Sequence, residues 1–363
     1  MRSLICVGEV CINSSQVSHF RKDKVMKAAV VERPGILVAK DVPEPEVGEN
    51  DILVKVRTAS ICNATDNHIL DGTFEGYHDF YPQILGHEVH GEVVAYGSKV
   101  EGVEVGERLV TYTPHGAFCE YTTLNASLFA RVPDELSQQE SPLCEMYHGS
   151  LLGTVYPAGL KDGEKVVVIG QGPMGLVTSQ CVKAMADVTL GAVDLVDFRL
   201  AKAKEVGADL VYNPSQHTSA QIAEQIERDM GPVDLVILCT AVDQSKAQDL
   251  FDFAVQILKR GGRLTGLNVE VKGLTHYVNV LPLFHKNILL RRSLFDVYPE
   301  DPRARAAKLR EVFQMGVNWV RDGKVNMKTL ITHVIPLEDI GHGLWLCRER
   351  PNETIKVVVN VAS

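Results

Sequence analysis

The sequence predicts an α/β protein in two parts, a mostly β part followed by a doubly wound parallel sheet, and three observations support this fold class. From residue 26 to about residue 155, short β-rich runs are broken by proline and glycine. Beyond Pro157, apolar strands alternate with helical stretches, as in a parallel sheet that helices cover on both faces. A glycine-rich turn at residues 170–175 follows the first of these strands and opens a helix.

Composition sets the broad class of the protein. Its 363 residues are enough for two domains with separate cores, and 45% hydrophobic with 23% charged residues is typical of a globular protein. A net charge of -9 argues against a nucleic acid or a membrane surface as partner, because both require a basic face. No apolar run approaches the roughly 18 residues that span a bilayer. The eight scattered cysteines do not form a disulfide pattern, so we expect a reducing, cytoplasmic compartment.

Residues 1–25 are expected to be a flexible N-terminal extension. The apolar run at 4–7 is too short for the core of a secretory signal, and the charged run at 21–24 lies at the wrong end for one. A strand-like run begins at Met26 and marks the start of the folded chain. The first domain is therefore expected over residues 26–155.

Half-buried strands are predicted in this first domain by alternating apolar and polar residues. The alternation is present at 51–56, 91–97 and 108–112. Strands of this kind bury one face only, which is typical of antiparallel sheets. We expect a curled or barrel-like antiparallel sheet.

A second domain is expected over residues 156–297, where short apolar strands and helices alternate. The predicted strands lie at 166–169, 189–193, 210–212, 235–238 and 263–267. The predicted helices lie at 174–185, 199–205, 219–229 and 246–258.

The remaining residues, 298–363, are expected to return to the first domain. Asp301 as N-cap and Pro302 in the first turn predict a helix that runs to about Arg321. Short strands at 330–333 and 357–359 follow it. These strands would complete the sheet of the first domain.

The glycine-rich turn predicts a dinucleotide site. Three glycines permit a tight turn and bring a pyrophosphate close to a helix N-terminus, and the turn comprises Gly170, Gly172, Pro173, Met174 and Gly175. Asp194 ends the next strand, about 20 residues after the turn, where an acid binds the adenosine ribose. A carboxylate there repels a 2′-phosphate, so NAD is expected in preference to NADP, although Arg199 lies near enough to complicate that preference.

A metal site is predicted by Cys62, His87 and a later carboxylate. Three such ligands with a fourth position left open are the arrangement of a catalytic zinc site. Taken singly, Cys62 is more often a small buried hydrophobe, and His87 a core histidine with its hydrogen bonds satisfied. Gly86-His87-Glu88 beside a Cys, Thr, Asp and His run favours the metal.

On these residues the chain resembles the zinc-dependent medium-chain alcohol and polyol dehydrogenase family, of the sorbitol and threonine dehydrogenase kind, from Met26 to the end. The matching pieces are Ser60-Ile61-Cys62, Thr65-Asp66, His68, Gly86-His87-Glu88, the turn at 170–175, Asp194, Arg199-Leu200, Cys239-Thr240 and Gly261-Gly262-Arg263. The resemblance implies a GroES-like, mostly β catalytic domain and a Rossmann NAD-binding domain that includes Cys239 and Thr240. It also implies a zinc-dependent enzyme that transfers hydride between NAD and an alcohol or carbonyl substrate.

The chain departs from the family pattern around its metal ligands. One extra residue separates Cys62 from Thr65, so that counting back from His68 points to Asn63 and counting forward from Ser60 points to Cys62. Thiolate binds zinc far better than a neutral amide, which favours Cys62.

The third ligand is the second departure. The family often has a Glu-Pro-Leu run before the cofactor domain, whereas this chain has Cys144-Glu145-Met146. Glu145 fits best and Cys144 competes, while Glu145 could also simply stabilise a helix N-terminus. Residues 106–121 contain one cysteine, Cys119, instead of the four of a structural zinc lobe, so one catalytic zinc and no structural zinc are expected.

The resemblance also assigns roles to the neighbours of the metal. It implies a proton relay from the hydroxyl of Thr65 through the nicotinamide ribose to His68, whose imidazole titrates near neutrality. Asp66 would orient His87, and Glu88 would lie beside the metal or bind it transiently. An ordinary loop hydroxyl and a surface histidine remain the alternatives for Thr65 and His68.

The resemblance implies hydride transfer between NAD and a polyol, a sugar alcohol or another hydroxyl-rich compound, in a direction that the sequence does not decide, and a homo-oligomer, a dimer or a tetramer, is expected. The alternatives are a zinc-free quinone or enoyl reductase of the same fold, and a dinucleotide-binding protein without catalysis. The segments 72–77 and 267–286 are expected to line the pocket or an interface, and the sequence does not decide which.

Overall fold

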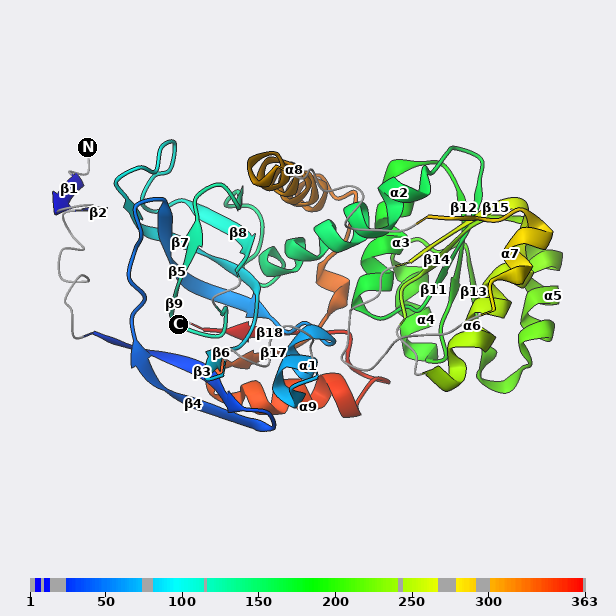
Figure 1. The fold of residues 1–363 in the computed structure, drawn as a ribbon, viewed down its shortest axis with the longest axis horizontal. Helices are drawn as coiled ribbons and strands as arrows, with labels where there is room; N and C mark the ends of the chain where they lie inside the picture. Colours follow the sequence, from blue (N-terminus) through cyan, green and yellow to red (C-terminus); the bar gives the residue numbers. More distant parts are fainter. Residues whose placement is uncertain are drawn as a thin grey trace.

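The computed structural model describes residues 4–7, 10–13, 24–73, 81–113, 116–240, 244–266, 279–291 and 301–361. Two lobes lie side by side in Figure 1, one carrying both chain termini and the other carrying the parallel sheet. Much of the segments 72–77 and 267–286, expected at the pocket or an interface, falls outside the described residues.

A sheet of nine strands forms the first lobe, with the order β1-β2-β7-β5-β18-β17 and with β8, β9 and β10 paired at its side. Most of its pairs are antiparallel, as expected for the first domain, but β5 and β7 are buried along most of their length instead of on one face only, so the expectation of half-buried strands was wrong there. Its strands are β1 (Leu4–Val7), β2 (Val10–Asn13), β5 (Asp51–Ser60), β7 (Glu88–Gly97), β8 (Arg108–Tyr112), β9 (Tyr121–Asn125), β10 (Ala130–Arg131), β17 (Ile331–Pro336) and β18 (Lys356–Asn360). A second sheet of three strands has the order β4-β3-β6, with bounds Ile36–Pro43, Val25–Arg33 and Gln83–Ile84.

The two chain ends both contribute to the larger sheet. Strand β18 pairs antiparallel with β5, with Val358 opposite Ser60. In the segment expected to be a flexible extension, β1 and β2 form a hairpin, and β2 pairs with β7 through Val10 opposite Gly97. The extension therefore adds an edge to the sheet. Helix α9 (Ile340–Glu349), which the sequence analysis did not predict, packs against β17 and β18.

The second lobe contains the predicted doubly wound sheet, whose six strands are all parallel in the order β13-β12-β11-β14-β15-β16. The strands are β11 (Lys165–Ile169), β12 (Thr189–Val193), β13 (Leu210–Tyr212), β14 (Val233–Leu238), β15 (Leu258–Gly266) and β16 (Leu289–Leu290). The helices are α3 (Pro173–Met185), α4 (Asp197–Glu205), α5 (Ser219–Met230), α6 (Gln244–Ile257) and α7 (Leu281–Lys286). The fold class is confirmed.

Successive side chains of β11 point to opposite faces of the sheet, and helices cover both faces. Val166 and Val168 belong to one core with Leu176 of α3, whereas Val167 belongs to another with Ile222 of α5. All three valines are fully buried. A strand buried on both faces must be apolar throughout, which is the pattern that the sequence shows.

Among the described residues, the chain passes from the first lobe to the second through helical turns. A 3-10 helix, η2 (Ser141–Met146), leads into a π-helix, η3 (His148–Val155), and a short α2 (Tyr156–Ala158). Helix α8 (Pro302–Arg321) begins as predicted, with the Asp301 carboxylate accepting a hydrogen bond from the backbone N–H of Ala304 at 2.7 Å. A Cβ on Gly316 would lie 2.0 Å from the ring of Tyr147, so α8 packs directly on the segment between η2 and η3. No helix in the described part of the chain is both long and apolar enough to cross a membrane.

Candidate metal centre and cofactor turn

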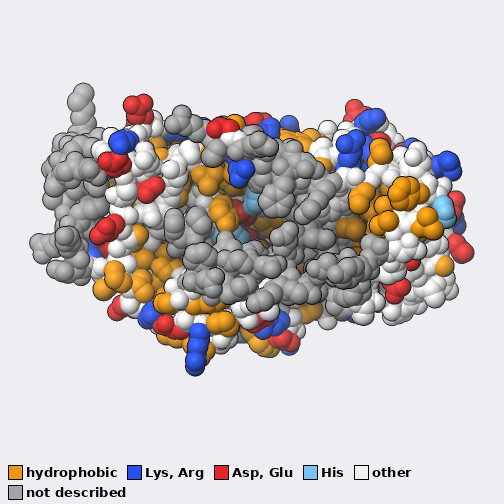
Figure 2. All heavy atoms as spheres, in the orientation of Figure 1, with side chains coloured by type: hydrophobic (Ala, Val, Ile, Leu, Met, Phe, Trp, Pro, Cys, Tyr) orange, Lys and Arg blue, Asp and Glu red, His pale blue; other side chains and the backbone are white. Residues whose placement is uncertain are grey.

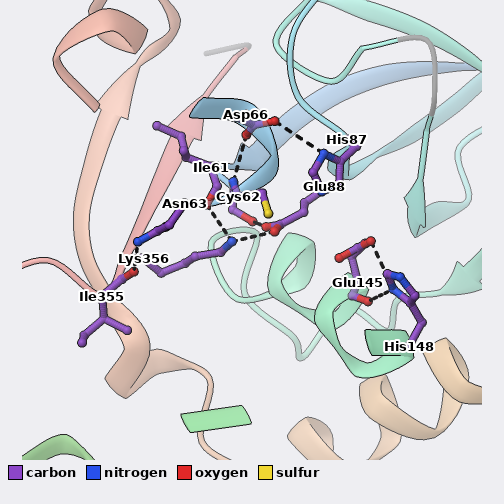
Figure 3. A network of polar contacts seen from close by, with 11 residues as sticks. Ile61, Cys62, Asn63, Asp66, His87, Glu88, Glu145, His148, Ile355 and Lys356 are labelled. Atoms are coloured by element: carbon purple, nitrogen blue, oxygen red, sulfur yellow. Dashed lines mark hydrogen bonds and ion pairs between the residues drawn. The ribbon is translucent and has the colours of Figure 1, made fainter. Parts of the chain in front are cut away.

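Strand pairing brings Cys62 and His87 together. Ser60, the last residue of β5, lies opposite Glu88, the first residue of β7. Cys62, two residues after the end of β5, therefore lies near His87, the residue before β7. The sulfur, nitrogen and oxygen ligand atoms of Cys62, His87 and Glu88 all lie within 4.8 Å of one another (Figure 3). Thiolate, imidazole and carboxylate are the donors that zinc takes in proteins, so the cluster fits this metal.

Asp66 holds the histidine of this cluster. Its carboxylate is fully buried, with Oδ1 3.4 Å from Nδ1 of His87 and Oδ2 accepting a hydrogen bond from the backbone N–H of Cys62 at 2.9 Å. Burial lowers the pKa of His87, but contacts with Asp66 and Cys62 outweigh it and raise the pKa well above its ordinary value. An imidazole held at Nδ1 by a carboxylate presents Nε2 to a metal, which is the usual arrangement.

The side chains of Cys62 and Asn63 point in different directions. The amide of Asn63 donates a hydrogen bond to the backbone carbonyl of Ile355 at 3.3 Å, on the side of β18. In Figure 3 the Cys62 sulfur lies beside the Glu88 carboxylate, whereas the Asn63 side chain points away toward Ile355. This geometry supports the register counted forward from Ser60, in which Cys62 is the metal ligand.

Both oxygens of Glu88 are engaged. One is 2.6 Å from Nζ of Lys356, and the other accepts a short hydrogen bond from the hydroxyl of Ser60. Lys356 is 1% exposed and also donates to the carbonyl of Ile61 at 2.7 Å. Burial lowers the pKa of Lys356, but the charges of Glu88 and Cys62 outweigh it and raise the pKa above the ordinary value. Lys356 is therefore a cation inside the site.

Glu145 lies close to this cluster without belonging to it. It is buried in η2, its Oε1 accepts no hydrogen bond of good geometry, and that oxygen is 3.2 Å from Nδ1 of His148. Burial raises the pKa of Glu88 above its ordinary value, the charge of Lys356 lowers it, and the negative charge of Glu145 raises it, so the two carboxyls share one electrostatic environment. Cys144, the competitor, is fully buried in the apolar core, and burial raises the pKa of its thiol, which disfavours the thiolate that a metal needs.

The two expected relay residues lie on one helix, α1 (Thr65–Asp71). Thr65 is its first residue and is half-buried. His68 is half-buried one turn later, with its Nδ1 2.9 Å from the hydroxyl of Thr73. Burial lowers the pKa of His68.

The glycine-rich turn has the geometry of a phosphate cradle. Gly170 has a φ of 91°, which favours glycine, and a Cβ on Gly175 would lie 1.8 Å from the carbonyl oxygen of Gly170. Nothing lies within 4 Å of the position that a Cβ on Gly172 would occupy. Pro173 and Met174 form the first turn of α3, so the open space faces a helix N-terminus.

Asp194 and the Cys239-Thr240 pair flank this turn. The Asp194 carboxylate accepts hydrogen bonds from the backbone N–H groups of Gln171 at 2.6 Å and Val196 at 2.9 Å, and Arg199 lies 4.0 Å away. A Cβ on Gly170 would come within 2.8 Å of both the Cys239 carbonyl oxygen and Cβ of Thr240. All the predicted cofactor residues therefore meet at the carboxyl edge of the parallel sheet.

Sequence reasoning missed Lys356, and it gave His148 no role beyond a structural or pocket-lining one. A signal for Lys356 was present, since a lysine interrupts the apolar run at 355–359 and a buried charge needs a partner. The signal for His148 was only its spacing of three residues from Glu145, which puts both on one side of a helical turn.

Comparisons with known proteins agree with this geometry. Residues 48–134 match the alcohol dehydrogenase GroES-like domain, and residues 173–320 match the zinc-binding dehydrogenase family. Sorbitol dehydrogenase of Ovis aries is 28% identical over 344 residues, covering 85% of this chain and 89% of the relative. Sorbitol dehydrogenase of Bacillus subtilis is 26% identical, covering 92% and 97%. A solved Escherichia coli short chain alcohol dehydrogenase complexed with NADH has a TM-score of 0.76 and 25% identity, covering 93% and 99%.

Proposed function

Because this chain belongs to the zinc-dependent medium-chain alcohol and polyol dehydrogenase family, we propose that it transfers hydride between NAD and a polyol, a sugar alcohol or a similar hydroxyl-rich compound. The observation that carries the proposal is the meeting of Cys62, His87 and Glu88 within 4.8 Å. The sorbitol dehydrogenases among its relatives support the polyol class. A zinc-free reductase and a binding protein without catalysis leave this cluster unexplained.

Three residues are proposed as the metal ligands: Cys62, His87 and Glu145. Glu88 lies within 4.8 Å of Cys62 and His87, but both of its oxygens are taken by Ser60 and Lys356. Glu145 is preferred as the third ligand because its Oε1, 3.2 Å from Nδ1 of His148, is buried without a hydrogen bond. When bound, zinc supplies a Lewis acid that lowers the pKa of the substrate hydroxyl, and NAD supplies the hydride acceptor. The negative charge of Glu88 then compensates the positive charge of Lys356 beside the metal.

The proton that the substrate loses is proposed to leave through Thr65 and His68. A hydroxyl both accepts and donates a proton, and burial lowers the pKa of His68, which favours the neutral imidazole that a proton relay passes through. Contact between His68 and Thr73 fixes the imidazole at Nδ1, which leaves Nε2 for the relay.

Specificity for NAD is proposed to come from Asp194. Its two hydrogen bonds to backbone N–H groups hold the carboxylate at the end of β12, where it would accept hydrogen bonds from the adenosine ribose. The negative charge repels a 2′-phosphate. Arg199, near this carboxylate, would line the same pocket.

A homo-oligomer and a reducing, cytoplasmic compartment are also proposed. Exposed apolar side chains gather on α7 and the edge strand β16, namely Val280, Leu281, Phe284, Leu289 and Leu290. Figure 2 shows hydrophobic atoms grouped over this end of the second lobe. An apolar patch beside β16, which has no neighbouring strand on its outer side among the described residues, is suited to a second copy of the chain. The six cysteines that are free thiols in the described residues support the reducing compartment.

A substrate screen tests the proposed function. Purified protein is incubated with NAD and, separately, with alcohols, polyols and sugar acids, and NADH is followed with and without a chelator. We expect NADH production with one or more polyols and its loss with the chelator. Turnover of quinones or enoyl compounds alone would support the zinc-free reductase instead.

A further inference from the structure

Gln171 lies between the first two glycines of the cofactor turn and is fully buried. Its side-chain Nε2 donates a hydrogen bond to the backbone carbonyl of Val168 in β11 at 3.0 Å. Its Oε1 accepts a hydrogen bond from the hydroxyl of Ser179 in α3 at 3.2 Å, and Ser179 is fully buried as well. The amide of Gln171 therefore anchors the turn to the strand before it and to the helix after it.

The backbone of the same residue contacts the acid that is proposed to bind the adenosine ribose. The N–H of Gln171 donates a hydrogen bond to Oδ2 of Asp194 at 2.6 Å, and the other oxygen of this carboxylate accepts one from the N–H of Val196 at 2.9 Å. Asp194 directly follows β12, which pairs with β11 in the parallel sheet (Figure 1). Gln171 thus joins the phosphate turn to the ribose carboxylate.

The glycines on both sides of Gln171 make an anchor useful. Glycine adopts a wider range of backbone angles than other residues, and Gly170 already has a φ of 91°. Rotation of the peptide between Gly170 and Gln171 would swing the Gln171 N–H away from Asp194. A side chain that is hydrogen-bonded at both ends of its amide opposes this rotation, because the backbone cannot turn without breaking buried hydrogen bonds.

We propose that Gln171 is a positioning residue that holds the Asp194 carboxylate in place for the adenosine ribose and so strengthens the preference for NAD over NADP. A carboxylate fixed beside the ribose accepts hydrogen bonds from its hydroxyls and repels a 2′-phosphate. A displaced carboxylate does both less well. The inference rests on the proposed role of Asp194 in cofactor specificity.

Two glutamine-to-leucine variants separate positioning from general stability. Gln171→Leu keeps a side chain of similar size and removes both amide hydrogen bonds. Gln180→Leu is the matched control, because Gln180 is a buried glutamine of α3 whose Oε1 accepts a hydrogen bond from the N–H of Asn326, a contact that does not involve the turn. Calorimetric titration of each purified chain with NAD and with NADP, without substrate, measures both affinities, and thermal unfolding measures the Tm.

We expect Gln171→Leu to bind NAD about tenfold more weakly, which corresponds to one lost hydrogen bond. Binding of NADP should weaken by a smaller factor, because the displaced carboxylate also repels the 2′-phosphate less. The ratio of the two affinities therefore narrows. Gln180→Leu should lower the Tm through its own lost hydrogen bond and leave this ratio unchanged.

Two results would overturn the inference. An unchanged ratio of NAD to NADP affinity in Gln171→Leu would remove the positioning role, and an equal change in Gln180→Leu would assign the effect to lost stability. If Gln171→Leu does not fold, Ser179→Ala takes its place, because it removes the hydroxyl that holds Oε1 of Gln171, and the ratio is judged in the same way.

An Asp194→Ala variant distinguishes the failure of this inference from that of the proposed specificity residue. If Asp194→Ala keeps the NAD preference of the unaltered chain, Asp194 does not select the cofactor and both ideas fall. If Asp194→Ala loses that preference and Gln171→Leu keeps it, only the positioning role is wrong.

Discussion

At the scale of single residues, the register around Cys62 decides which side chain reaches the metal. We predict that Cys62→Ser loses bound zinc while Asn63→Ala retains it, because the Asn63 amide is engaged with Ile355 instead of the cluster. Metal analysis of both purified variants measures this. Zinc lost from Asn63→Ala and kept by Cys62→Ser would reverse the assignment.

The buried ion pair of Glu88 and Lys356 should matter for stability. Lys356→Met leaves the Glu88 carboxylate buried without its cation, which typically costs about 3–5 kcal/mol. Denaturant unfolding of the metal-free protein gives this loss in the free energy of unfolding. The double variant Lys356→Met with Glu88→Gln, in which neither charge remains, is expected to recover part of it. A single variant as stable as the unaltered protein would show that the pair carries no net stabilisation.

Residues of the site differ in how visible they are in the sequence. Cys62, His87 and Glu88 are readable because ligand types and the Gly-His-Glu context define them locally. Lys356 is separated from Glu88 by 268 residues, and only the pairing of β18 with β5 brings the two together. The ring contacts of His148 with Tyr112 and Phe313 likewise depend on where β8 and α8 pack.

At the scale of elements, two glycines of the same turn should respond differently to alanine. Gly175→Ala would place Cβ 1.8 Å from the Gly170 carbonyl oxygen, so the turn must shift, at a cost of about 1–3 kcal/mol as in other overpacked sites. Gly172→Ala meets nothing in the protein and should leave the Tm unchanged, but its Cβ would stand where the pyrophosphate approaches.

Thermal unfolding and NAD titration separate these effects. The Gly175 variant should lose both Tm and NAD affinity, and the Gly172 variant NAD affinity alone. Equal Tm values for the two variants would contradict this account of the turn.

Elements were predictable where one local pattern dictates them. Continuous apolar runs gave the parallel strands, and the Asp301-Pro302 pair gave the start of α8. The π-helix η3 and helix α9 lack such a pattern. Nearly every residue of η3 is buried, so no polar face alternates with an apolar one, and α9 contains two glycines, which weaken a helical signal. The hairpin of β1 and β2 depends on the distant edge of β7, which a local pattern does not show.

At the scale of the whole molecule, the apolar end of the second lobe predicts self-association. Phe284 is 76% exposed on α7, and Phe284→Asp would place a charge in a buried interface, so we expect the oligomer to dissociate. Sedimentation velocity measures the change. Val334→Asp on β17, where Val334 is 45% exposed, serves as the control and should keep the oligomer. A monomeric unaltered chain would disprove the proposed interface.

The most direct test of the whole account is the zinc content of the purified chain, measured together with NAD-dependent polyol oxidation before and after chelation. The account predicts close to one zinc per chain, loss of oxidation when the zinc is removed, and recovery when zinc is returned. Polyol oxidation that continues in protein verified to be free of metal would contradict it.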